Sequence, residues 1–301
     1  MGQAQPAAAP QTTQTAQPER KTIQPRKGPD FGLQGDDIPR YWLGGDPFKS
    51  RFFDALSCLF PEGERFFIAC VRDFRDRIDD PELQAQVRDF IYQEGQHGQV
   101  HKQYNDRLGR QGIAVDRIIQ QQSDVLFKFM RRKMSKTYTL GQTAAAEHVT
   151  ALMAHSFFDS GVMREADPRM RAVFAWHAIE EIEHKAVAFD VFRDIAGGGY
   201  FTRALSMLQV AITFPLHTFM IMRHMFRVDG IGNGPRLWLK GLWWLYGPRG
   251  VFTRLLPHFL VYFKPGFHPW KHGTMATYDK WQAAYAQGGD AIAAGNAAAG
   301  V

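Results

Sequence analysis

Two Glu-x-x-His sequences recur in this chain, and each follows a further glutamate at a similar distance. The first glutamate precedes its motif by 30 residues and the second by 34; in chain order the residues are Glu64, Glu94, His97, Glu147, Glu181 and His184. A Glu and a His three residues apart lie on the same face of a helix. Carboxylate and imidazole groups gathered in this way suit iron and manganese ions.

The glutamates occupy positions that belong to apolar helix stripes. The stripe of the second predicted helix steps by four and three through Leu83, Val87, Phe90, Glu94, His97, His101, Tyr104 and Leu108. Burying an ionised carboxylate is costly unless it is paired or bound to a metal, and neither Lys nor Arg shares these stripes. The sequence therefore predicts that metal ions neutralise the buried carboxylates.

Inward-facing glutamates on four helices, two of them in Glu-x-x-His motifs, are the ligand set of ferritin-like bundles that hold two metal ions. We predict an all-α fold: a ferritin-like four-helix bundle with additional C-terminal apolar or amphipathic helices. The motif glutamates, Glu94 and Glu181, are predicted to bridge the two ions. The predicted terminal ligands are Glu64, Glu147, His97 and His184.

Three residues close to Glu181 could also be considered as metal ligands. His177 precedes Glu181 by four residues and shares its helix face, so a seventh ligand is possible. Glu180 also borders the stripe and is an alternative to Glu181. Glu183 is expected to point outward.

Further histidines could orient the ligands without binding metal themselves. His101 lies one turn beyond His97, where it could orient a ligand or line a substrate pocket. His148 and His155 lie one position off the Glu147 stripe, and for both a hydrogen-bonded role is favoured over metal binding. The alanines around Glu147 either leave room for metals or substrate or reflect helix propensity alone.

Composition divides the chain into four parts. Residues 1–29 are rich in Gln, Ala, Pro and Thr and are expected to be a disordered tail. The bundle is predicted for residues 30–196, a basic apolar helical extension for 197–286, and a second disordered tail for 287–301. The two cysteines, Cys58 and Cys70, are not expected to form a disulfide, which fits a reducing cytoplasm.

The extension combines positive charge with apolar side chains. Between Phe201 and Tyr278 nine Lys and Arg residues accompany a single acid, Asp229. Aromatic residues mixed with Lys and Arg favour the interface of an anionic membrane, rather than nucleic acid, as the partner. Two alternatives are a buried extension of the core or homodimer contact, and a membrane span within 204–222, which lacks charged residues.

Two segments resemble a known family. Glu94-Gly-Gln-His97 and the stretch from Trp176 to Lys185 resemble the predicted metal-dependent hydrolases, a ferritin-like group, over about residues 40 to 275. The ligand order is also similar to that of di-iron N-oxygenases that oxidise arylamines. This second resemblance implies a seven-ligand site in which His177 is the additional histidine.

We expect a non-haem di-iron enzyme that activates dioxygen and oxidises a lipid or other apolar substrate, as an oxygenase, desaturase or N-oxygenase. It would use two Fe ions, with Mn/Fe as an alternative pair, and take electrons from an external donor. The alternative function is a two-metal-dependent hydrolase, and a third is a membrane-associated iron store or sensor. The expected location is cytoplasmic and peripheral, on the inner face of a membrane.

Overall fold

The computed structural model describes residues 22–35, 37–232, 234–271 and 276–301. Within these residues the protein is all-α, as the sequence predicted, and pairing of the strand type is limited to one isolated bridge between Leu43 and Ala166. Residues 1–21 of the predicted N-terminal tail lie outside the described part of the chain.

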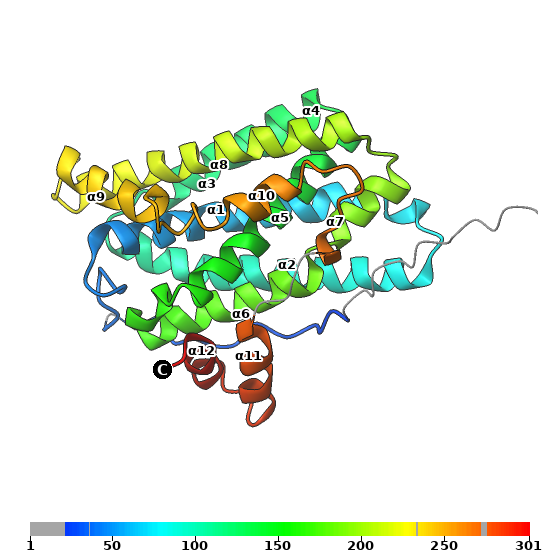
Figure 1. Ribbon diagram of the computed structural model, residues 1–301. Helices are drawn as coiled ribbons and strands as arrows, with labels where there is room; N and C mark the ends of the chain where they lie inside the picture. Colours follow the sequence, from blue (N-terminus) through cyan, green and yellow to red (C-terminus); the bar gives the residue numbers. More distant parts are fainter. Residues whose placement is uncertain (1–21, 36, 233, 272–275) are drawn as a thin grey trace, which may run out of the picture.

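Four long helices form the centre of the molecule (Figure 1). They are α1 (Pro47–Arg72), α2 (Pro81–Arg110), α5 (Lys136–Asp159) and α6 (Pro168–His184). Helix α1 packs against α2 and α5, and α6 packs against α5 and α2. Each helix therefore has two neighbours, an arrangement consistent with the predicted four-helix bundle.

Local sequence determines where three of these helices begin. An aspartate caps each of them and a proline follows at the first helical position: Asp46 before α1, Asp80 before α2 and Asp167 before α6. The carboxylate accepts hydrogen bonds from backbone N–H groups that have no partner within the helix, and proline has none to lose there. Ser135 caps α5 in the same way.

Shorter elements connect and extend the bundle. Between α2 and α5 lie α3 (Val115–Ser123), the π-helix η2 (Asp124–Met130) and α4 (Arg131–Lys133). After α6 come α7 (Val187–Asp190), the π-helix η4 (Val191–Ile195), α8 (Tyr200–Val228), α9 (Pro235–Tyr246), α10 (Leu256–Val261), α11 (Ala276–Ala286) and α12 (Ala291–Ala299). Three short 3₁₀ helices are η1 (Arg75–Arg77), η3 (Val162–Glu165) and η5 (Pro269–Lys271).

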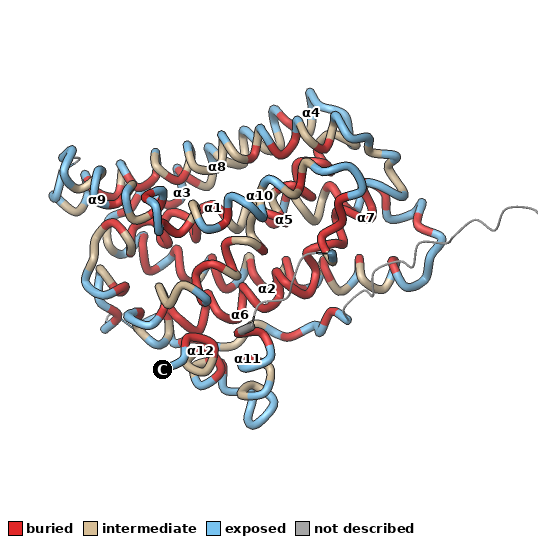
Figure 2. Tube along the Cα trace, viewed as in Figure 1, coloured by how far each residue is buried: buried red, intermediate tan, exposed pale blue. Residues whose placement is uncertain are grey.

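Helix α8 lies along the bundle on the side opposite α11 and α12 (Figure 1). It packs against α1 and α5 and buries Met207, Met222 and Phe226. Its outer side is exposed (Figure 2). Among the described residues it is the one helix long and apolar enough to cross a membrane by length and composition, and about a third of that apolar window is buried.

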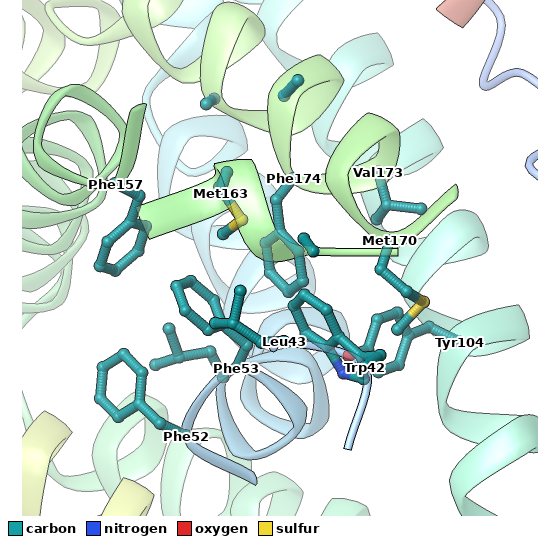
Figure 3. Packing of buried hydrophobic residues seen from close by; sticks show 14 of the residues in the cluster. Trp42, Leu43, Phe52, Phe53, Tyr104, Phe157, Met163, Met170, Val173 and Phe174 are labelled. Carbon is teal, nitrogen blue, oxygen red and sulfur yellow. The ribbon is translucent and has the colours of Figure 1, made fainter. Parts of the chain in front are cut away.

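Buried hydrophobic side chains, many of them aromatic, pack together in the core (Figure 3). Trp42 stacks on Phe174 with ring centroids 5.7 Å apart, and Phe53 meets Phe157 edge-on at 4.6 Å. The ring of His101, predicted to orient a ligand or line a substrate pocket, lies 6.2 Å from Phe174, so this core borders the predicted site. Close-packed aromatic rings of this kind exclude water and hold neighbouring side chains in one rotamer.

Residues 22–29, predicted as part of the disordered tail, belong to an ordered strap formed by residues 22–35. This N-terminal strap has no regular secondary structure, contacts α2 and α6, and buries Ile23, Phe31 and Leu33. Its backbone is bonded to the bundle, since Gly28 N donates to Gln96 Oε1. A few well-placed apolar residues therefore hold a segment whose average composition resembles that of disordered chains.

The C-terminal residues also differ from the expected tail. Helix α12 packs against α6 and buries Ala291, Ala294 and Ala298. A Cβ atom on Gly295 would come within 2.9 Å of the Cα of Ala172. Small residues therefore allow close approach of the two helices, and packing replaces the large apolar side chains that this segment lacks.

Candidate metal centre

All four bundle helices direct acidic or imidazole side chains into one buried region. Helix α1 contributes Glu64; α2 contributes Glu94, His97 and His101; α5 contributes Glu147; and α6 contributes His177, Glu181 and His184. Every one of these side chains is at most 5% exposed. The spacing along the sequence and the packing of the helices thus bring the predicted ligands together.

One group of possible ligands consists of Glu94, His97, Glu181 and His184, with one donor atom of each within 4.8 Å of the others. Glu94 Oε2 lies 3.9 Å, and Glu181 Oε1 3.7 Å, from His97 Nδ1. The same two carboxyl groups approach His184 Nε2, at 3.4 Å for Glu94 Oε1 and 3.9 Å for Glu181 Oε1. Both glutamates therefore lie between the two histidines.

A second group consists of Glu64, His101 and His177, again with donor atoms within 4.8 Å of one another. It adjoins the first group, because His177 Nε2 lies 3.0 Å from Glu181 Oε1 and 4.0 Å from Glu64 Oε1. The rings of His97 and His177 stack with centroids 4.1 Å apart. The two groups of possible ligands therefore adjoin one another in the bundle.

Glu147 lies beside the first group. His184 Nδ1 donates a hydrogen bond of 2.9 Å to Glu147 Oε2, and the hydroxyl of Thr150 donates to Glu181 Oε2. The other oxygen of Glu147 faces no hydrogen-bond donor. Glu147 thus keeps one carboxylate oxygen free within the cluster.

The clearest sign of a cation site is a set of buried polar atoms in this cluster that have no hydrogen-bond partner among the described residues. These atoms are both carboxylate oxygens of Glu64, both of Glu94, Oε1 of Glu147, Nδ1 of His97 and Nε2 of His184. Buried polar groups are almost always paired, because an unpaired one costs about 1–3 kcal/mol. Seven such atoms in one cluster fit metal ions well.

Burial also shifts the proton equilibria of the carboxyl groups. Loss of hydration raises the pKa of Glu64 and Glu94 well above the usual value, and raises that of Glu147 to about 7. For Glu181 burial acts in the same direction, but the hydrogen bond from His177 and nearby histidines outweigh it, and the pKa is lowered. Bound cations would replace the protons that these carboxyl groups otherwise need.

His97 has the surroundings of an oriented metal ligand. Its Nε2 lies 3.0 Å from Glu180 Oε2, and when Glu180 is ionised this contact places the N–H on that side of the ring. The unpartnered Nδ1 then faces Glu94 and Glu181. A carboxylate that accepts the second N–H of a ligating histidine is a common support of metal sites. Glu180 therefore lies behind His97, whereas Glu181 faces the other ligands.

Glu183 does not point outward, in contrast to the sequence-based expectation. It is buried, and Arg26 of the N-terminal strap donates hydrogen bonds of 2.7 and 3.0 Å to its two oxygens. Gln93, Tyr278 and Gln282 also donate to it. Since Arg26 contacts Glu180 as well, at 3.3 Å, the strap is connected through Glu180 to His97. No sequence pattern singled out Arg26, because it lies in a segment of disordered composition.

The other candidate histidines lie elsewhere. His148 is buried, and its ring packs against Tyr262 and Phe267 at centroid distances of 4.9 and 5.1 Å. His155 is half-exposed and pairs with Asp159 at 3.0 Å. Cys58 and Cys70 are buried and free, as expected.

A helical bundle with a buried cluster of carboxylate and imidazole groups defines a metal-binding protein. The chain belongs to the family described as predicted metal-dependent hydrolase, whose model matches residues 24–273. This agrees with the resemblance seen in the sequence. Comparison with curated proteins and with solved structures finds no match.

Proposed function

We propose that the chain is a ferritin-like di-iron enzyme that uses dioxygen to oxidise an apolar substrate. The observation that carries this proposal is the cluster of seven unpartnered ligand atoms on three buried glutamates and two histidines. Oxygen and nitrogen donors without thiolate suit iron and manganese. Two ferrous ions would supply electrons for the reduction of dioxygen and so drive hydroxylation, desaturation or N-oxygenation.

The chain's own residues have distinct parts in this proposal. Glu94 and Glu181 would be shared by the two ions, and the approach of each carboxyl group to both His97 and His184 supports this role. Glu64 and Glu147 would bind at the two ends. The surrounding aromatic core keeps water from the cluster, which strengthens every electrostatic interaction inside it.

The family description favours hydrolysis, the second candidate function. With redox-inert ions such as zinc, the same cluster would lower the pKa of a water molecule and so make it a nucleophile at neutral pH. The identity of the metal therefore separates the two candidates.

Metal analysis and Mössbauer spectroscopy of protein loaded anaerobically with iron-57, before and after exposure to O2, test the proposal. We expect two irons per chain that oxidise to a coupled diferric pair. Diferrous protein that stays unchanged in O2, with apolar substrates such as fatty acids present, or purified protein that contains zinc, would favour hydrolysis instead.

A matched pair of variants identifies the ions as residents of this cluster. Glu94→Gln removes a central carboxylate with little change in shape and should lose most of the bound iron. Glu82→Gln, on the exposed first turn of the same helix, should bind two irons. Equal iron content in the two variants would place the metal elsewhere.

We also propose that the enzyme works at an anionic membrane surface. Support comes from the outer side of α8, where Leu205, Leu208, Ile212, Leu216 and Met220 are each at least half exposed. Exposed basic residues lie on and after α8: Arg223, Arg227, Arg236, Lys240, Arg249, Arg254, Lys264 and Lys271. Exposed apolar side chains accompanied by basic residues are typical of proteins that bind the interface of a negatively charged bilayer.

A further inference from the structure

An apolar cavity of about 150 Å³ lies beside the metal centre. It is enclosed by α1, α5, α8 and the π-helix η2, which contribute Phe67, Leu126, Ala146, Val149, Val210 and Phe214 to its wall. Glu64, a ligand in the proposed centre, lines the same cavity. Cavity and metal centre therefore share a wall.

The wall also contains polar atoms that no other group satisfies. Both oxygens of Glu64 and Nε2 of Gln142 are buried and lack a hydrogen-bond partner among the described residues. Gln142 is only 5% exposed. Metal binding accounts for Glu64, but an amide N–H cannot bind a cation. Gln142 is thus available to donate to a polar group of a molecule in the cavity.

The cavity reaches the surface between η2 and α8. Val125 of η2 lines it and is 40% exposed, and Gln209 and Thr213 of α8 line it next to the exposed Leu208 and Ile212. π-helical turns are rare and occur frequently at functional sites. An apolar molecule on the outer side of α8 would meet this opening directly.

We propose that this cavity binds the apolar part of the substrate and holds its reacting end against Glu64. A cavity of this size and lining accommodates one benzene-sized group, so the fitting ligand is a ring or a stretch of about six carbons. Gln142 then bonds a polar atom of the same molecule. This inference rests on the proposed function for its chemistry, but ligand binding can be measured without turnover.

Calorimetric titration of the metal-loaded full chain with n-alkyl alcohols, from butanol to decanol, tests the inference. Each added methylene should strengthen binding about fourfold until the cavity is full, because burial of one methylene contributes about 0.8 kcal/mol. Beyond about six carbons the affinity should level off. A constant affinity along the series, or one that rises through decanol, would overturn the proposal.

Two variants change the cavity in opposite directions. Ala146→Leu fills it and should weaken hexanol binding at least tenfold, whereas Ala85→Leu, at a half-buried alanine outside the cavity, should leave it unchanged. Leu126→Ala enlarges the cavity and should move the levelling point to longer alcohols. Ala146→Leu with unaltered hexanol affinity, or Leu126→Ala with an unaltered levelling point, would contradict the assignment.

The alcohol-binding experiment tests the cavity assignment separately from the proposal that the enzyme activates dioxygen. Alcohol binding with the expected cut-off in protein that holds zinc would keep the cavity assignment while removing oxygen activation. Two oxygen-reactive irons in protein that binds no alcohol would do the reverse.

Discussion

A chain of hydrogen bonds determines which nitrogen of His177 carries a proton. Asn105 Nδ2 donates to the carbonyl of Ser57, so Asn105 Oδ1 accepts the Ser57 hydroxyl proton. The Ser57 oxygen then accepts from His101 Nδ1, at 2.9 Å. Burial lowers the pKa of His101 and keeps it neutral, so its Nε2 accepts from His177 Nδ1, at 2.7 Å.

The consequence is that His177 Nε2 faces the oxygens of the cluster, where it is hydrogen-bonded to Glu181 and offers a lone pair when a cation replaces the shared proton. That nitrogen lies 3.0 Å from Glu181 Oε1, and two lone pairs at this distance need a cation or a proton between them. The geometry thus supports the prediction that His177 is a ligand.

Replacement of His101 tests this hydrogen-bond chain. His101→Phe removes the acceptor for His177 Nδ1, and loss of such a support typically weakens metal binding about 10- to 100-fold. Iron titration under anaerobic conditions measures the change. His101→Gln, which retains an acceptor oxygen, should recover part of the affinity.

The control is His155→Phe, because His155 is half-exposed and paired with Asp159 on the bundle surface. This variant should bind iron as the unaltered protein does. The hydrogen-bond chain has no role in binding if His101→Phe and His155→Phe have the same affinity.

Among individual residues, the ones predictable from sequence were those that interrupt a periodic apolar stripe. Glu94 and His97 belong to this class. Ser57, Asn105 and Arg26 were not predicted, because their importance arises from hydrogen bonds between helices or from a loop to a helix. Such contacts depend on the rotation and register of the packed helices, which the spacing of residues in one helix does not determine.

At the scale of single helices, the exposed apolar face of α8 predicts binding to a membrane surface. Its exposed apolar side chains lie three or four residues apart and so share one helix face. The protein should therefore co-sediment with vesicles of phosphatidylcholine and phosphatidylglycerol. Binding should weaken with phosphatidylcholine alone or at high salt, because the basic residues then lose their attraction to the surface.

A double variant, Leu208→Glu with Ile212→Glu, should reduce vesicle binding at least tenfold. Tyr92→Glu, at an exposed aromatic residue of α2, is the control and should bind normally. If instead the double variant only converts a dimer to a monomer on size exclusion, and the unaltered protein ignores vesicles, the face is a contact between copies of the chain.

Helices, like single residues, could be predicted from sequence where the pattern lies within one segment, and not where it depends on contact with another helix. Helices α1, α2 and α6 have stripes that include large apolar residues, and the structure places helices there. Helix α12 was missed because its contact with α6 is made by alanine and glycine, whose small surfaces give a weak hydrophobic pattern. The close approach of the α12 and α6 backbones at Gly295 compensates for the weak hydrophobic pattern of α12. This approach depends on both helices and cannot be inferred from the sequence of α12 alone.

At the scale of the whole molecule, the buried cluster should make the stability of the metal-free protein depend on pH. Burial raises the pKa of Glu147 to about 7 and of Glu180 to about 8, and the Glu147 carboxylate outweighs burial to raise that of His184 to about 9. Between pH 6.5 and 8 the folded protein thus holds protons that the unfolded chain has released. Stability must therefore fall as pH rises through this window.

Thermal unfolding of the metal-free protein should show this as a Tm several degrees lower at pH 8 than at pH 6.5. Each such group contributes up to about 2 kcal/mol over 1.5 pH units, and ~1 kcal/mol corresponds to a shift of about 2–4 °C. Added Fe²⁺ under anaerobic conditions should raise Tm, and more so at pH 8, because metal binding needs deprotonated ligands.

A Tm of the metal-free protein that is constant or rises from pH 6.5 to 8 would show that the cluster does not hold these protons. His97 and His101 do not disturb the comparison. Burial lowers the pKa of both, so their effect on stability is confined to pH values below about 6.5, the usual histidine pKa.

The hydrogen bonds around Glu183 indicate at which stage of translation the protein becomes able to bind iron. They connect Gln24 and Arg26, among the first described residues, with Tyr278 and Gln282 in α11. A ribosome that has completed the four bundle helices has made every proposed ligand but has yet to make α11. We therefore expect iron to enter a chain whose translation is essentially complete, and nascent bundles to hold their ligands in a looser arrangement until then.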